Sequence, residues 1–151
     1  MRRGFSLIEI TIFVAILSVF LIMVLRLATT SLSTLKTNER RLYATRYAEE
    51  ITEWLGAEKE NDWDNTFLPK TVLPVGTQTV YCFNSTPLTA WPAAGACPGY
   101  TLNGFFKREV SMSRQLNAGT DYQITAIVTV SWVQGAGTMS VPVTIVYNKY
   151  E

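Results

Sequence analysis

The stretch from Phe5 to Leu25 reads FSLIEITIFVAILSVFLIMVL, and the rest of the chain is interpreted from it. An α-helix of about 20 apolar residues covers roughly 30 Å, which is the thickness of a bilayer core. The stretch therefore predicts a membrane-spanning helix. It contains an acid, Glu9, although an ionised side chain inside hydrocarbon costs on the order of 3 kcal/mol. We expect Glu9 to have a function that outweighs this cost.

Positive charge precedes this stretch, because Arg2 and Arg3 lie just before it. A basic flank tends to remain in the cytoplasm, so the rest of the chain is expected outside the cytoplasm. A secretory signal peptide is an alternative interpretation, since the small residues Ala28 to Thr30 provide a tolerable cleavage region. The length of the apolar run and the acid Glu9 argue against it. A plain membrane anchor is a third interpretation, and it gives Glu9 no role.

The residues Gly4 to Ile10, GFSLIEI, resemble the processing site of type IV prepilins and type II secretion pseudopilins. In that family a prepilin peptidase cuts after the glycine and methylates the new N-terminal residue. The resemblance implies a cut between Gly4 and Phe5, with Phe5 becoming N-methylphenylalanine. Glu9 matches the acid that the family carries five residues into the mature chain.

Such a cut would explain the position of the acid. The new α-amine on Phe5 would have an ordinary pKa of about 8 and be mostly cationic at neutral pH. In a filament, the amine of one subunit can lie beside Glu9 of another within a dry helix bundle. Each charge then offsets the desolvation of the other, and wrong registers leave Glu9 unpaired. We expect Glu9 to set assembly and register rather than to catalyse a reaction.

One long helix is predicted to continue beyond the membrane segment, because no proline or glycine occurs between Phe5 and Leu55. Gly56 is the expected stop. Apolar residues recur at helical spacing in the second half, which predicts a face that packs on a sheet. This face comprises Ala44, Tyr47, Ala48, Ile51, Trp54 and Leu55. The opposite face is expected to be solvated, and it carries Arg46, Glu49, Glu50 and Glu53.

Strand patterns follow the helix. Residues 77–83 and 105–113 predict two short strands, whereas residues 122–132 and 139–147 alternate clearly between apolar and polar side chains. Alternation of this kind is typical of half-buried antiparallel strands. The loop at residues 134–137 predicts a hairpin. Pro142 cannot donate a backbone hydrogen bond, so its strand is expected at an edge or a bulge.

These patterns predict an α+β fold, in which a long N-terminal helix packs on a C-terminal antiparallel sheet. Pilins have this layout. The expected division is a leader at 1–4, a transmembrane or filament-core helix at 5–25, an amphipathic helix at 26–56, and a globular head at 57–151 with its αβ-loop and sheet. The hairpin around residues 127–132, IVTVSW, resembles minor pilins of the pilus-modification group. Pseudopilins share similar hairpins.

Two cysteines, Cys82 and Cys97, lie far downstream of the apolar stretch. In an extracytoplasmic head we expect them to form a disulfide. Closing a loop of about 15 residues stabilises a fold by roughly 3 kcal/mol in the chain-entropy model. Two free thiols are the alternative.

Composition argues against several other functions. The chain has no histidine, and histidine is the most frequent general base and transition-metal ligand. We therefore expect no catalytic site, no metal and no cofactor. The formal net charge is only +1, and two of the positive charges are Arg2 and Arg3, so nucleic-acid binding is not expected.

The resemblance implies a minor pilin, a structural subunit of a type IV pilus. Its expected partners are other pilin or pseudopilin subunits, the prepilin peptidase and an inner-membrane assembly platform. It would cross the inner membrane once with its N-terminus cytoplasmic, and its head would be periplasmic and later lie on the filament. A type II secretion pseudopilin is the nearest alternative. A membrane-anchored binding domain or adhesin that never polymerises is another.

Overall fold

The computed structural model describes residues 7–117 and 121–149, and it has the predicted α+β fold. The leader and Phe5 lie outside the described residues. A long helix, α1, is followed by two short helical turns and four strands. Their bounds are α1 Leu7–Asn61, η1 Trp63–Phe67, η2 Leu68–Lys70, β1 Thr79–Cys82, β2 Phe106–Asn117, β3 Asp121–Gln134 and β4 Gly137–Tyr147.

The chain divides into two compact units. The first ends at Arg40 and, in its described part, consists of helix α1 alone. The second begins at Arg41 and contains the C-terminal part of α1 together with every strand. We call this second unit the head.

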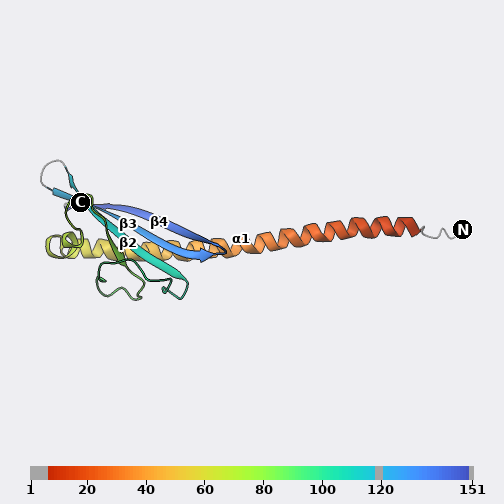
Figure 1. Ribbon diagram of the computed structural model, residues 1–151, viewed down its shortest axis with the longest axis horizontal. Coiled ribbons are helices and arrows are strands. Elements are labelled where there is room, and N and C mark those ends of the chain that lie inside the picture. The colour runs from red at the N-terminus through yellow and green to blue at the C-terminus, as the bar shows by residue number, and fades with distance from the viewer. Residues whose placement is uncertain (1–6, 118–120, 150–151) are drawn as a thin grey trace. The chain divides into compact units, whose positions relative to one another are not determined.

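The head is built around the predicted apolar face of α1. Ala44, Ala48, Ile51 and Leu55 are fully buried, and Tyr47 and Trp54 pack half-buried against the same core. Helical spacing brings these six residues onto one side of α1, and the sheet covers that side. Figure 1 shows β2, β3 and β4 side by side along this part of α1. The interpretation of the face is confirmed.

The sheet is antiparallel throughout, with the strand order β1-β2-β3-β4. Its inward residues are the ones that alternation predicted. Ile124, Ala126, Val128, Val130 and Trp132 of β3 are all buried. On β4 the pattern is weaker, because Tyr147 is buried whereas Met139 at the other end is exposed. Pro142 lies on an edge strand, as expected.

The predicted strand bounds need correction. β1 is shorter than residues 77–83, and β2 runs to Asn117 rather than to residue 113. β3 extends to Gln134 because the hairpin turn contains only Gly135 and Ala136. Gly135 has a φ of 62°. Glycine reaches this left-handed region without strain, which allows a two-residue turn instead of the four-residue loop expected from composition.

The predicted helix end is wrong, because α1 continues through Gly56 to Asn61. A glycine within a helix costs only about 1 kcal/mol relative to alanine, and the helix-favouring residues Ala57 to Glu60 follow it. The last turns are also held from outside. The indole nitrogen Nε1 of Trp91 donates to Oε2 of Glu58 over 3.0 Å. Beyond α1, Trp63 and Phe67 are buried and continue the core.

Replacing Gly56 with alanine should stabilise the protein. A Cβ at this position meets no atom within 4 Å, so the substitution removes the flexibility of glycine without a clash. We expect Gly56→Ala to raise the free energy of unfolding by roughly 0.5–1 kcal/mol in urea denaturation of the detergent-solubilised chain. The matched control is Gly135→Ala, which should destabilise because of its positive φ. A destabilising Gly56→Ala would mean that α1 ends there in solution.

Candidate functional site

The N-terminal part of α1 presents a mostly apolar surface. Every residue from Leu7 to Lys36 is exposed. Its most apolar window has a mean hydropathy of 2.8, and no residue in that window is buried. This segment is long and apolar enough to cross a membrane. Exposed apolar surface on this scale is typical of a membrane or protein interaction site.

The two hydroxyl groups between Leu7 and Leu25 donate to carbonyls of their own helix. The Thr11 hydroxyl donates to the carbonyl of Leu7 over 2.6 Å. The Ser18 hydroxyl donates to the carbonyl of Val14 over 2.7 Å. Because each donor is bonded to its own helix, neither needs a water molecule, and both are compatible with an apolar environment.

Glu9 is the one charged residue between Leu7 and Leu25. It is exposed on the first turns of α1, and no described residue forms an ion pair with it. Gly4, Phe5 and the basic residues before them lie outside the described residues, so their predicted relation to Glu9 remains a prediction. The carboxylate is therefore available to a partner that the described chain does not supply.

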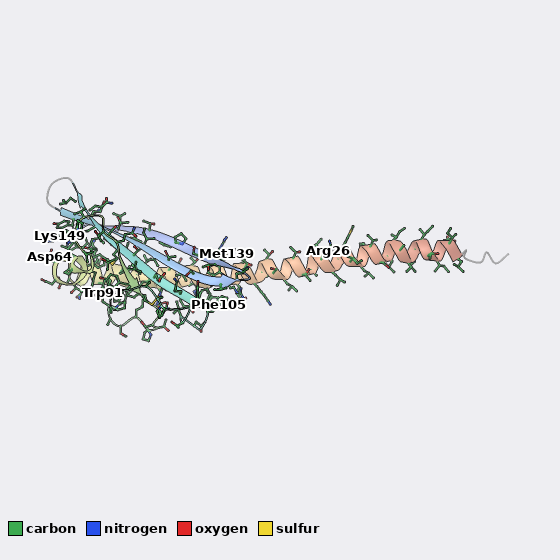
Figure 2. All side chains as sticks on the ribbon, viewed as in Figure 1. Arg26, Asp64, Trp91, Phe105, Met139 and Lys149 are labelled. Atoms are coloured by element: carbon green, nitrogen blue, oxygen red, sulfur yellow. A yellow bond between two sulfur atoms is a disulfide. The ribbon has the colours of Figure 1, made fainter. Side chains whose placement is uncertain are left out.

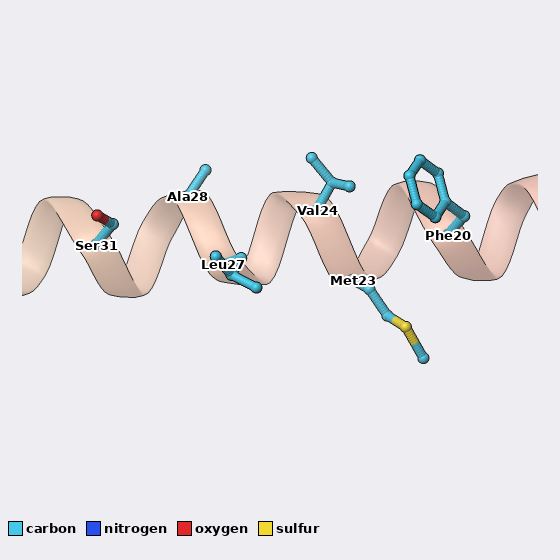
Figure 3. Close-up of a pocket in the computed structure, with 6 residues that line it drawn as sticks. All are labelled: Phe20, Met23, Val24, Leu27, Ala28 and Ser31. Carbon is cyan, nitrogen blue, oxygen red and sulfur yellow. The ribbon is translucent and has the colours of Figure 1, made fainter.

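A shallow groove runs along the same helix (Figure 3). Small side chains, Ala28 and Ser31, lie beside larger ones. The lining residues are Phe20, Met23, Val24, Leu27, Ala28 and Ser31. Their spacing of three, four and seven places them along one side of the helix. A groove of this shape accepts a ridge of side chains from another helix.

Within the head, a buried guanidinium joins the sheet to α1. Arg108 of β2 has no exposed surface. Its Nη1 donates to Oε2 of Glu50 over 2.8 Å and to the carbonyl of Tyr47 over 3.1 Å, both on α1. Its Nε donates to the carbonyl of Phe83 over 2.8 Å, and its Nη2 to that of Ser85 over 3.2 Å. One side chain thus joins α1, β2 and the segment after β1.

The segment after β1 is held by further polar contacts. Oδ1 of Asn84 accepts from the backbone nitrogen of Arg108 over 2.8 Å. Nδ2 of Asn84 donates to the carbonyl of Gly99 and to Oγ1 of Thr101, over 2.9 and 2.8 Å. Asn84 therefore ties both ends of the loop that precedes β2 to the sheet.

The predicted disulfide is present between Cys82 and Cys97. It closes a loop of mostly exposed, small or uncharged residues. The backbone nitrogen of Cys97 also donates to Oε1 of Glu109 over 2.8 Å. The disulfide and this hydrogen bond thus hold the C-terminal end of the loop against the sheet.

Aromatic residues close the core at the far end of α1. Trp91 lies at the centre, and its ring contacts those of Trp54, Tyr81, Phe83 and Phe67. Figure 2 labels Trp91 and, nearby in the head, Asp64 and Lys149, whose ion pair measures 2.8 Å. Trp91 thus covers the core from the loop that follows β1.

Sequence reasoning missed Arg108 and placed its partner Glu50 on a solvated face. The signal was present, because Phe106, Val110 and Met112 share one face of β2 and Arg108 falls on the same face. Alternation alone would have placed a charged side chain in the core. A buried arginine requires several acceptors, and its need for a carboxylate points to the helix beneath.

Comparison of the chain with known protein families, with characterised proteins and with solved structures finds no match.

Removing Arg108 should destabilise the head far more than neutralising Glu50. Arg108→Met leaves the buried carbonyl of Phe83 without this donor and removes three further hydrogen bonds, and we expect a loss of roughly 2–4 kcal/mol in unfolding free energy. The Glu50 side chain is 41% exposed, so solvent screens its share of the pair. Glu50→Gln should therefore cost less than about 1 kcal/mol. Urea denaturation followed by tryptophan fluorescence measures both. Equal losses of unfolding free energy for the two variants would mean that Arg108 does not stabilise the head mainly by donating to carbonyls.

The head should lose stability in alkali through its buried tyrosines. Burial raises the pKa of Tyr147 to about 12, and burial also raises the pKa of Tyr81. An unfolded tyrosine titrates near pH 10, so between about pH 10 and 12 the folded state holds more protons. The free energy of unfolding is thus unaffected by this group below that window and falls as the pH rises through it. Tyr147→Phe should flatten this fall in denaturation curves; an unchanged slope would contradict the assignment.

Proposed function

We propose that this chain is a prepilin, a minor structural subunit of a type IV pilus that is processed at Gly4-Phe5 and assembles through α1. The observation that carries the proposal is the combination on one helix of an exposed apolar surface and an unpaired carboxylate. Glu9 lies within that surface, and no described residue neutralises it.

The position of Glu9 supports assembly rather than anchoring. A carboxylate among lipid tails costs on the order of 3 kcal/mol, and a static anchor gains nothing from that cost. In a bundle of such helices, the cationic amine of a processed Phe5 on a neighbouring subunit offsets it. The carboxylate then favours one register, because every other register leaves it unpaired.

The head supports the proposal because its core needs no partner. The apolar face of α1 from Ala44 to Leu55 is covered by the chain's own sheet. The apolar surface before Lys36 is not covered by any described residue. A subunit that moves from lipid into a filament needs a head that is stable by itself and a helix surface that is free to exchange lipid for other helices.

The disulfide supports a head outside the cytoplasm. Disulfides such as Cys82–Cys97 persist in oxidising compartments and are rare in the cytosol. With the basic residues Arg2 and Arg3 retained inside, the proposed location is the inner membrane with a periplasmic head. After assembly the head would lie on the filament surface.

The experiment that tests the processing step is mass analysis of the N-terminal peptide from native membranes. We expect a peptide that begins at Phe5 and carries one additional methyl group. A chain that begins near Thr29 would mean a secreted domain. An intact Met1, in cells with active prepilin peptidase, would mean an anchored domain that is never processed. Either result would overturn the proposal.

Substitution of Glu9 separates assembly from anchoring. We expect Glu9→Ala to leave the amount of the chain in the membrane unchanged while its recovery in sheared filaments falls at least roughly tenfold, which corresponds to about 1.4 kcal/mol. The matched control, Glu39→Ala, removes an exposed acid of α1 beyond the apolar segment and should leave recovery unchanged. Normal filament recovery for Glu9→Ala would favour the static anchor.

A further inference from the structure

The two edges of the sheet differ in how they are covered. At the β1 edge, the backbone nitrogen of Gly95 donates to the carbonyl of Val80 over 2.7 Å, and Ala94 bridges to Tyr81. The loop fixed by the disulfide thus closes this edge. At the other edge, no described residue makes a backbone hydrogen bond to the outer side of β4, which runs from Gly137 to Tyr147. β4 is the open edge.

This open edge lacks most of the features that discourage strand pairing. Natural edge strands are commonly short, charged, bulged or interrupted by proline. β4 has 11 residues, GTMSVPVTIVY, and none is charged. Its register with β3 is continuous from Gln134–Gly137 to Ile124–Tyr147, so it has no bulge. Of these features, β4 has only Pro142.

The hairpin turn determines which β4 residues direct their backbone N–H and C=O groups away from β3. Gly135 has a positive φ and Ala136 does not, which is the type II′ pattern of a two-residue hairpin. In such a hairpin the flanking residues, here Gln134 and Gly137, exchange hydrogen bonds with each other. Bonded pairs alternate with unbonded pairs along an antiparallel ladder. The even-numbered β4 residues therefore direct their backbone groups away from β3.

The chemistry of proline independently indicates that the even-numbered β4 residues direct their backbone groups away from β3. Pro142 pairs with Thr129 within a continuous ladder, although it has no N–H to donate. It fits without loss only where its nitrogen points away from β3. The outward donors are therefore those of Thr138, Ser140, Thr144 and Val146, and Pro142 interrupts this row at its centre.

We propose that Pro142 keeps the open edge of the head from pairing with the same edge of a second copy. A second copy is the partner that this edge fits, because two uncharged β4 strands can meet antiparallel about a two-fold axis with no like charges opposed. In such a pair, the ring of Pro142 lies against the backbone of the opposing strand at the centre of β4, where another residue would donate an N–H. The proposal rests on the edge alone and does not depend on pilus assembly.

The orientation of the row is tested first by amide hydrogen exchange in the full-length chain, resolved by NMR in detergent. The amides of Thr138, Ser140, Thr144 and Val146 should exchange roughly 100-fold or more faster than those of Val141 and Val143. The second pair is bonded to β3 and serves as the internal control. Equal protection of the two sets would overturn the proposal, because Pro142 would then not face the open edge.

The function of Pro142 is tested by two substitutions that both restore the N–H. Pro142→Val provides an uncharged strand residue, whereas Pro142→Lys places a charge on the edge. Light scattering of the detergent-solubilised full-length chain should show a shift from monomer toward dimer for Pro142→Val alone. In that dimer the Thr144 and Val146 amides should become protected. Both variants retain α1, so association through the helix cancels in the comparison.

Two results would overturn the proposal. Pro142→Val could remain as monomeric as the unsubstituted chain, which would mean that the proline is not what keeps the edge unpaired. Pro142→Lys could associate as strongly as Pro142→Val, which would mean that association does not occur through the β4 edge.

Discussion

The buried guanidinium of Arg108 constrains three separate parts of the head at once. It must find acceptors inside the protein, and it takes them from α1 and from the segment after β1. A buried cation that loses its acceptors is costly, so these parts cannot separate without a large penalty. The disulfide and the contacts of Asn84 hold the same segment after β1 that Arg108 contacts. The aromatic cluster around Trp91 then fills the space that this arrangement defines.

The regular parts of the fold were predictable because their causes are local and periodic. Spacing of three and four from Ala44 to Leu55 places one face of α1 in the core. Alternation along β3 does the same for the sheet. The disulfide was predictable from two cysteines and an expected compartment. In each case, a few residues with a known period or chemistry decide the outcome.

The remaining features depend on distant contacts. Gly56 is a common stop signal, yet α1 passes through it because Glu58 and the aromatic residues beyond it are held by the head. Glu50 looked solvated because its partner lies on β2, and residue spacing says nothing about that distance. In the proposed function, the state of Phe5 and its relation to Glu9 would depend on processing and on neighbouring subunits, and neither follows from the folding of one chain.

In the proposed assembly, the hydrogen bonds of Thr11 and Ser18 to their own helix would limit how a neighbouring helix is recognised. A hydroxyl that already donates to its own helix can only accept a hydrogen bond from an approaching helix, so Thr11 and Ser18 offer no donor for recognition. Between Leu7 and Leu25, Glu9 is then the only charged side chain. In the proposed assembly, a neighbouring helix would meet apolar side chains along most of this stretch and one carboxylate, that of Glu9. Contacts between two such helices would thus be readily reversible until the Glu9 carboxylate is paired with a cationic group.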